Sequence, residues 1–120
     1  MSVDTPQFIY KIATASSLAA ARHSGRYEGM PIDAGDGYMH FSTATQLGET
    51  LRLHFKGQQD LVILAIPTAG LSENLVWEPS RGGQLFPHLY GGPLDMDLVE
   101  WEAIVSVDEA GNCTLPEAVK

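Results

Sequence analysis

The spacing of hydrophobic and polar residues predicts a chain that begins with a strand and a helix. Aromatic and β-branched residues at 8–12 indicate a first strand, and the segment 60–66, apolar from its second residue on, indicates a buried central strand. Between these two strands, the Ala-rich segment 14–23 predicts a short helix that stops at Gly25.

A second helix is predicted after Thr43. Leu47, Leu51 and Phe55 recur every four residues, so they form one apolar stripe on a helix surface. Thr43 and the glutamine three residues later have the spacing of a capping box, and Gly57 ends the helix.

The remaining chain is mostly extended. Short strands are predicted at 38–42, 74–78, 85–90 and 98–107, whereas the Gly- and Asp-rich segment 29–37 predicts a loop. Two helices are too few for a doubly wound sheet. The fold class is therefore α+β, with small mixed or antiparallel sheets and the helices on one side.

The composition fits one folded domain spanning 1–120, with a core at about 8–107 and polar tails. Hydrophobic residues make up 44% of the 120 residues and charged residues 18%, which is ordinary for a globular protein. No apolar run is long enough to cross a bilayer, and the polar N-terminus lacks the pattern of a signal peptide. We therefore expect a cytoplasmic protein without membrane association.

The charge balance limits the classes of partner that this protein is expected to bind. Seven basic and 15 acidic residues give a net charge of −8, which opposes general nucleic-acid binding but leaves room for a local anion site. Cys113 is the single cysteine, so neither an internal disulfide nor a Cys-based zinc site can form. We expect a small-molecule or nucleotide ligand, and the oligomeric state stays open.

The first candidate cluster is His40-Phe41-Ser42-Thr43, where a predicted strand enters the second helix. Free N–H groups of a first helical turn, together with hydroxyl and imidazole side chains, suit an anion or a polarised substrate group. Alternatively, Ser42 and Thr43 only cap the helix, and His40 is a hydrogen-bonded strand residue.

The second and third clusters lie further along the chain. Glu78 follows an apolar strand and Trp77; desolvation would raise its pKa and a cationic partner would lower it. His88 and Tyr90 are two residues apart in an extended segment, so they project from one face. In the alternative interpretations, Glu78 is a solvated surface residue and His88 with Tyr90 forms a structural corner.

Together these clusters predict one site built from His40, Glu78, His88 and Tyr90. A two-histidine, one-carboxylate metal site from His40, His88 and Glu78 is an alternative. No local His spacing and no recognisable second shell favours this alternative, so we expect no metal.

Several motifs of the chain resemble the DUF952 family, a family of uncharacterised bacterial proteins. They are Ile9-Tyr10, His40-Phe41-Ser42-Thr43, Leu61-Val62, Val76-Trp77-Glu78 and Phe86-Pro87-His88-Leu89-Tyr90-Gly91 followed by Pro93-Leu94. The resemblance covers about residues 8–107. The family is remotely similar to the ADP-ribosyltransferase-like superfamily, which implies an ADP-ribosyltransferase-like fold.

This similarity implies NAD bound in a cleft between two small sheets. Members place a polar residue on a first strand, an aromatic or hydroxyl residue on a second and an acid on a later one. Tyr10 or Lys11, His40 and Glu78 match this order, with Lys11 where some members have histidine. Segment 38–47 resembles the second-strand motif of the rifampin-modifying branch, with His40 where tyrosine is usual.

The implied catalytic residues are His40 and Glu78, with Glu78 stabilising an oxocarbenium ion or orienting a ribose hydroxyl. Three functions stay open: transfer of ADP-ribose from NAD, non-catalytic binding of a small molecule or nucleotide, and hydrolysis with His40 as base and Glu78 as partner. The implied ligand-binding residues are Tyr10, Lys11, Ser42, Thr43, Trp77, His88 and Tyr90.

Overall fold

The computed structural model describes residues 6–71 and 73–119, and the polar N-terminal residues 1–5 lie outside the described residues. The α-helices are α1 (Ala15–Leu18), α2 (Ala21–Ser24), α3 (Pro31–Asp36) and α4 (Ala44–His54). Three single turns of 3₁₀-helix span Thr68–Leu71, Arg81–Gly83 and Met96–Leu98. The strands are β1 (Phe8–Thr14), β2 (Arg26–Tyr27), β3 (Met39–His40), β4 (Leu61–Pro67), β5 (Leu75–Pro79), β6 (Leu85–Leu89), β7 (Leu94–Asp95) and β8 (Trp101–Val105).

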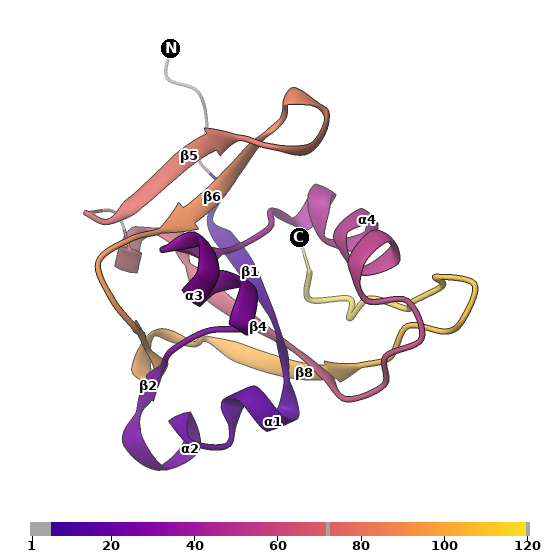
Figure 1. The fold of residues 1–120 in the computed structure, drawn as a ribbon, viewed down its shortest axis with the longest axis horizontal. Helices are drawn as coiled ribbons and strands as arrows, with labels where there is room; N and C mark the ends of the chain where they lie inside the picture. The colour runs from indigo at the N-terminus through magenta and orange to yellow at the C-terminus, as the bar shows by residue number, and fades with distance from the viewer. Residues whose placement is uncertain (1–5, 72, 120) are drawn as a thin grey trace.

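These strands form three small sheets, in the orders β1-β4-β8, β2-β7 and β3-β6-β5 (Figure 1). Every strand pair among the described residues is antiparallel, so the predicted α+β class and antiparallel pairing are confirmed. None of the described helices has the length and apolar character needed to cross a membrane.

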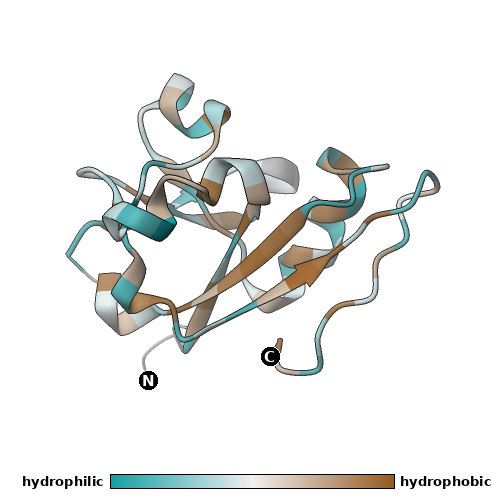
Figure 2. Cartoon of the chain, turned by 90° about the horizontal axis from the view of Figure 1, so that it is seen from below, coloured by the Kyte–Doolittle hydropathy of each residue, from teal (hydrophilic) through white to brown (hydrophobic). Residues whose placement is uncertain are grey.

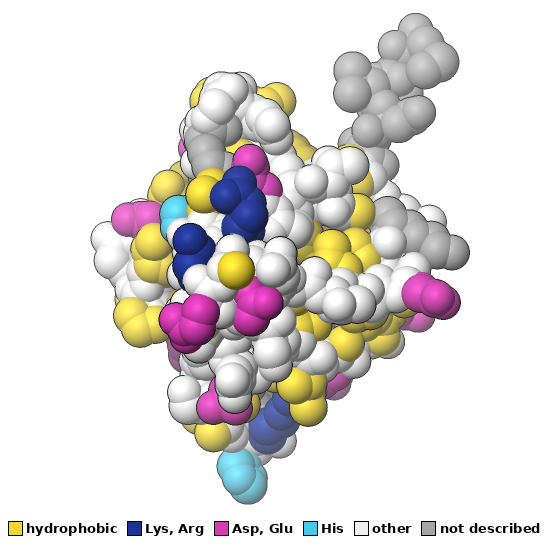
Figure 3. Space-filling view, turned by 90° about the vertical axis from the view of Figure 1, so that its right-hand side faces the viewer, with side chains coloured by type: hydrophobic (Ala, Val, Ile, Leu, Met, Phe, Trp, Pro, Cys, Tyr) yellow, Lys and Arg dark blue, Asp and Glu magenta, His cyan; other side chains and the backbone are white. Residues whose placement is uncertain are grey.

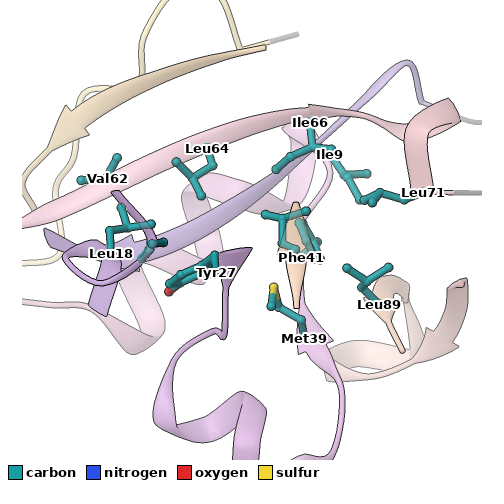
Figure 4. Packing of buried hydrophobic residues seen from close by; sticks show 13 residues of the cluster. Ile9, Leu18, Tyr27, Met39, Phe41, Val62, Leu64, Ile66, Leu71 and Leu89 are labelled. Atoms are coloured by element: carbon teal, nitrogen blue, oxygen red, sulfur yellow. The ribbon is translucent and has the colours of Figure 1, made fainter. Parts of the chain in front are cut away.

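The central strand β4 is covered on both faces, which explains its continuous apolar run. On one face, Ile63 packs with Leu47 and Leu51 of α4. On the other face, Val62 and Leu64 join a second cluster that includes residues of the two smaller sheets (Figure 4). Hydrophobic colour accordingly concentrates along the long central strands in Figure 2.

Helix α4 begins as its sequence predicts. The Thr43 side chain accepts from the N–H of Gln46 at 3.3 Å, and the Gln46 side chain accepts from the N–H of Thr43 at 3.0 Å. The Gln46 amide also donates to the carbonyl of Leu85 at 2.8 Å. This last bond joins the start of α4 to strand β6.

Two helix predictions need correction. The helices do not lie on one side, because α4 covers one face of the β1-β4-β8 sheet while Leu18 of α1 and Ala21 of α2 pack on the other. The single helix predicted at 14–23 is split, because the N–H of Ala19 bonds to the carbonyl of Ser16 in a tighter i→i−3 turn. Gly25, with φ of 78°, ends α2 as predicted.

The segment 29–37, predicted as a loop, contains helix α3. Helix α3 starts with Pro31, and the carboxylate of Asp33 accepts from the N–H of Met30 at 2.6 Å. It ends at Gly37, with φ of 82°. Sequence patterns missed α3 because a six-residue helix that contains a glycine has no apolar periodicity.

Strand β3 is much shorter than the predicted strand 38–42. His40 still pairs with β6, but Ser42 bridges to Tyr10 of β1, with backbone N···O distances of 2.8 and 2.9 Å. The chain therefore passes from the small sheet to the large sheet at Phe41. The last strand is likewise shorter than 98–107, because part of that segment forms a 3₁₀ turn.

Candidate functional site

The β3-β6-β5 sheet has one face on the core and one facing outward. Met39, Leu89 and Trp77 belong to or pack against the core cluster. Because side chains alternate along a strand, the residues between them point the other way. His40 and His88 are direct partners across β3 and β6, so both lie on the outward face.

Aromatic and imidazole rings gather on this outward face. The ring of Tyr38 stacks on His88, with a centroid distance of 4.3 Å and an interplanar angle of 29°. Its centroid also lies 4.8 Å from His40 and 5.1 Å from Tyr90. The two imidazoles meet edge-to-face at 5.2 Å. The structure thus brings three of the four predicted site residues around Tyr38.

Glu78 completes the set through hydrogen bonds. Its Oε1 lies 2.6 Å from Nδ1 of His88 and accepts from the hydroxyl of Tyr90 at 2.8 Å. The bond to His88, followed by that from Tyr90, lowers the pKa of Glu78. In turn, the bond to Glu78 raises the pKa of Tyr90 to about 12. The structure therefore brings His40, Glu78, His88 and Tyr90 together in one cluster of ring contacts and hydrogen bonds.

His40 is held by two carboxylates of α3. Its Nδ1 lies 2.7 Å from Oδ1 of Asp33, and its Nε2 lies 2.9 Å from Oδ2 of Asp36. The backbone N–H of His40 also donates to Asp33 at 3.0 Å. The helix missing from the sequence prediction therefore supplies both acidic partners of the predicted histidine.

Lys11 lies beneath this network. Its ammonium donates to Asp33 at 2.7 Å and to the carbonyl of His40 at 3.0 Å, and its side chain is only 3% exposed. Burial lowers the pKa of Lys11, and Asp33 opposes this effect. Burial would raise the pKa of Asp33, but the hydrogen bond from His40 and the charge of Lys11 hold it at about 2. Lys11 therefore anchors α3 and β3 from inside the fold.

The other predicted ligand contacts lie apart from the ring cluster. Tyr10 is fully buried on the α4 side of β1, where its ring centroid lies 5.9 Å from that of Trp101. Ser42 is buried beside Tyr10, and Thr43 caps α4. Trp77 packs toward the core. These four residues have evident structural roles in the fold.

Sequence analysis missed three neighbours of the site: Tyr38, Asp33 and Asp36. Tyr38 stands two residues before His40, so alternation along an extended segment could have placed both on one face. For the two aspartates the only signal is the i,i+4 spacing of Asp36 and His40. Their approach depends on α3, which the pattern did not predict.

Within the described ranges, no group of three or more His, Cys, Asp or Glu side chains has a geometry that could hold a metal ion. The imidazoles of His40 and His88 instead turn their Nδ1 atoms to separate carboxylates. The geometry therefore divides the residues of the alternative metal site between two hydrogen-bonded pairs.

A hollow of about 440 Å³ borders the ring cluster. Its walls come from residues 69–71, 73–74 and 89–93, with Asp95 and Leu98, and Tyr90 is one of the lining residues. Tyr90 thus belongs both to the ring cluster and to the hollow. A second hollow of about 550 Å³ lies elsewhere, along residues 104–108 and 112–114.

Charge on the remaining surface is mixed. On the face seen in Figure 3, which includes the α4 side of Figure 1, dark-blue Lys and Arg side chains lie next to magenta Asp and Glu side chains. The positive groups on this face lie in an upper area and in a separate spot near the bottom of the view. This face accordingly offers no continuous basic surface for a nucleic-acid backbone.

Comparison with known proteins identifies relatives of the whole domain. The family model for DUF952, described as a protein of unknown function, matches residues 12–102. The crystal structure of protein CC0527 from Caulobacter crescentus is similar at 43% identity, with a TM-score of 0.83 over 89% of this chain and 93% of that one. Its solution NMR structure gives 44% identity and a TM-score of 0.76, over 88% and 90% of the two chains. No curated protein matches the sequence. The chain therefore belongs to the DUF952 family, as its motifs predicted.

Proposed function

We propose that this domain binds NAD or a related nucleotide across the outward face of the β3-β6-β5 sheet. The observation that carries the proposal is the position of Tyr90, which contacts the ring cluster and is also one of the residues that line the 440 Å³ hollow. Hollows of this size hold small-molecule ligands in many proteins. The rings receive the nicotinamide half, and the hollow receives the remainder.

The ring cluster suits a nicotinamide. The oxidised ring is a flat, positively charged aromatic, which is attracted to the faces of tyrosines such as Tyr38 and Tyr90. The carboxylate of Glu78 adds a negative charge at the same place, and the lowered pKa keeps this carboxylate ionised. His40 and His88 offer further ring edges within the cluster.

In the catalytic form of the proposal, the domain transfers ADP-ribose. The bond between ribose C1′ and the nicotinamide nitrogen breaks, and its electron pair leaves with neutral nicotinamide. The lone pair of an acceptor O–H or N–H group then bonds to C1′, and the acceptor proton passes to a base or to water. Glu78 stabilises the positive charge that develops at C1′. This form follows the predicted kinship with ADP-ribosyltransferases.

Non-catalytic binding is the competing proposal, and the same residues serve it. Its support is the extent of hydrogen bonding around Glu78, whose Oε1 is shared by His88 and Tyr90. A carboxylate fixed in this way recognises a ligand without needing to change its own bonds. The two forms differ in whether nicotinamide is released.

Titration of the ¹⁵N-labelled protein with NAD tests binding directly. We expect amide shifts at Tyr38, His88 and Tyr90, and no shifts at millimolar NAD would refute both forms of the proposal. Ala69→Trp fills the hollow and should weaken NAD binding while leaving nicotinamide mononucleotide, which lacks the adenosine, unaffected. Equal loss for both ligands would contradict the division between rings and hollow.

Glu78→Gln separates catalysis from binding. In the transfer form, we expect the rate of nicotinamide release to fall about 100-fold and NAD affinity to fall much less, because the carboxylate interacts most strongly with the charge that develops in the transition state. The matched control is Glu102→Gln, because Glu102 is also a hydrogen-bonded strand glutamate but pairs with Arg22 on the large sheet. Binding of NAD without nicotinamide release by the wild-type protein would favour the non-catalytic form.

A further inference from the structure

We infer that His88 is the acid–base residue of this site and that His40, its partner across the strands, is a positioning residue. This inference rests on the proposed function only for the ligand that meets His88. The assignment of the two histidines comes from their hydrogen bonds. It reverses the sequence prediction, in which His40 carried the chemistry.

Both ring nitrogens of His40 face carboxylate oxygens, at 2.7 Å from Asp33 and 2.9 Å from Asp36. An ionised carboxylate only accepts hydrogen bonds, so each nitrogen must carry a hydrogen for both bonds to form. A doubly protonated imidazole has no lone pair and cannot act as a base. His40 in this arrangement therefore ties α3 to β3.

The surroundings of His40 keep the Asp33 carboxylate ionised and in place. The pKa of Asp33 is about 2, and Lys11 donates both to Asp33 and to the carbonyl of His40. Among the described residues, the rings of Tyr38 and His88 also face the His40 ring, at centroid distances of 4.8 and 5.2 Å. The cation at Lys11 and the anions of α3 thus fix the position of His40 from two elements.

His88 has a different setting. Its Nδ1 lies 2.6 Å from Glu78, so in the neutral ring the proton sits on Nδ1 and the lone pair on Nε2. A carboxylate behind one imidazole nitrogen orients the ring and stabilises its charged form when the other nitrogen takes a proton. In the transfer reaction, Nε2 of His88 takes the proton of the acceptor as the acceptor bonds to C1′.

Tyr38 covers this residue. Its ring stacks on the imidazole of His88, whose side chain is only 5% exposed. Tyr38 itself is partly exposed and follows Gly37 at the end of α3. A ligand ring that enters the site must therefore displace the Tyr38 ring or stack on it.

Nitrogen NMR of the ligand-free protein tests the assignment without NAD. Near neutral pH, we expect both ring nitrogens of His40 to show the chemical shifts of protonated nitrogens, and His88 to show a proton on Nδ1 and none on Nε2. Asp36→Asn should return His40 to a neutral tautomer and leave His88 unchanged. A wild-type His40 with one unprotonated nitrogen overturns the inference, whether or not NAD binds.

Diethyl pyrocarbonate supplies a second, chemical readout, because it acylates only an unprotonated and accessible imidazole nitrogen. The exposed His23 and His54 serve as internal references. In Tyr38→Ala, we expect His88 to react several-fold faster than in the wild-type protein, whereas His40 stays slow. Tyr38→Phe keeps the ring and should match the wild-type rate. A His40 that reacts as fast as His23 contradicts its assignment as a positioning residue.

Catalysis gives the last readout. Where nicotinamide is released, His88→Gln should flatten the dependence of the rate on pH, and His40→Gln should lower the rate without changing the shape of the profile. The reverse pattern overturns the inference and leaves the proposed function intact. An absence of NAD binding would refute the proposed function and leave the NMR assignment standing.

Discussion

The β1-β4-β8 sheet (the large sheet) and the β3-β6-β5 sheet (the small sheet) both have antiparallel strands, but they differ in how many of their faces are buried. Strands β1 and β4 of the β1-β4-β8 sheet are buried on both faces, and β4 is apolar along its length. The β3-β6-β5 sheet buries one face only, so its outward face can carry imidazoles, tyrosines and a glutamate. The large sheet therefore provides stability, and the small sheet provides the chemically versatile surface.

The largest effect is expected in the large sheet. Leu64→Ala removes a fully buried side chain of β4, so we expect a loss of about 4 kcal/mol in the free energy of unfolding. Val76→Ala on the outward face of β5 is the control, and its cost should stay below about 1 kcal/mol. Denaturant unfolding of both variants measures the difference. Equal losses of unfolding free energy in the two variants would contradict the view that the large sheet provides the stability.

Breaking the ion pair beneath the small sheet should cost somewhat less. Lys11→Met leaves the buried carboxylate of Asp33 without its cation, and we expect a loss of about 3 kcal/mol in the free energy of unfolding. Restoring neutrality with Asp33→Asn in the same chain should recover part of this loss. Arg22→Met, which breaks an exposed pair, should cost less than about 1 kcal/mol.

The next largest effect is expected from acid, which should reduce the contribution of Asp33 to the free energy of unfolding. The pKa of Asp33 is about 2 in the fold, below its ordinary value of 3.8. The carboxylate therefore stabilises the fold above about pH 4, and this contribution is lost as the pH falls toward 2. After allowance for solvent screening, we expect roughly 1.5 kcal/mol from this residue. The difference in unfolding free energy between wild type and Asp33→Asn should shrink by that amount over this pH range.

The smallest effect is expected on the outward face of the small sheet, where the pKa of one side chain should change. Glu78→Gln removes the negative acceptor that raises the pKa of Tyr90 to about 12, so this pKa should move toward 10.0. Ultraviolet absorbance of the tyrosinate form measures the change, with Tyr90→Phe identifying the signal. An unchanged titration would show that Glu78 and Tyr90 do not interact in solution.

The sequence predicts those parts of the molecule that depend on local patterns. The β4 strand follows from its apolar run, helix α4 from its stripe and cap, and the shared face of His88 and Tyr90 from alternation. Helix α3 could not be predicted, because six residues with an internal glycine leave no periodic signal. The partners of His40 were missed for the same reason. The roles of Tyr10 and Trp77 depended on which face of a strand meets the core, which requires the tertiary structure.

The chain passes from the small sheet to the large sheet at Phe41, and the number of residues at this passage is fixed. His40 pairs with β6 and Ser42 bridges to β1, so Phe41 alone separates the two connections. Inserting or deleting one residue there would reverse the alternation and turn either the imidazole inward or the phenyl ring outward. Segment 108–119, which follows the last strand, has no such parity to preserve. Cys113, Leu115 and Val119 of that segment still pack against the core, so changes in chain length should cost less there than at Phe41.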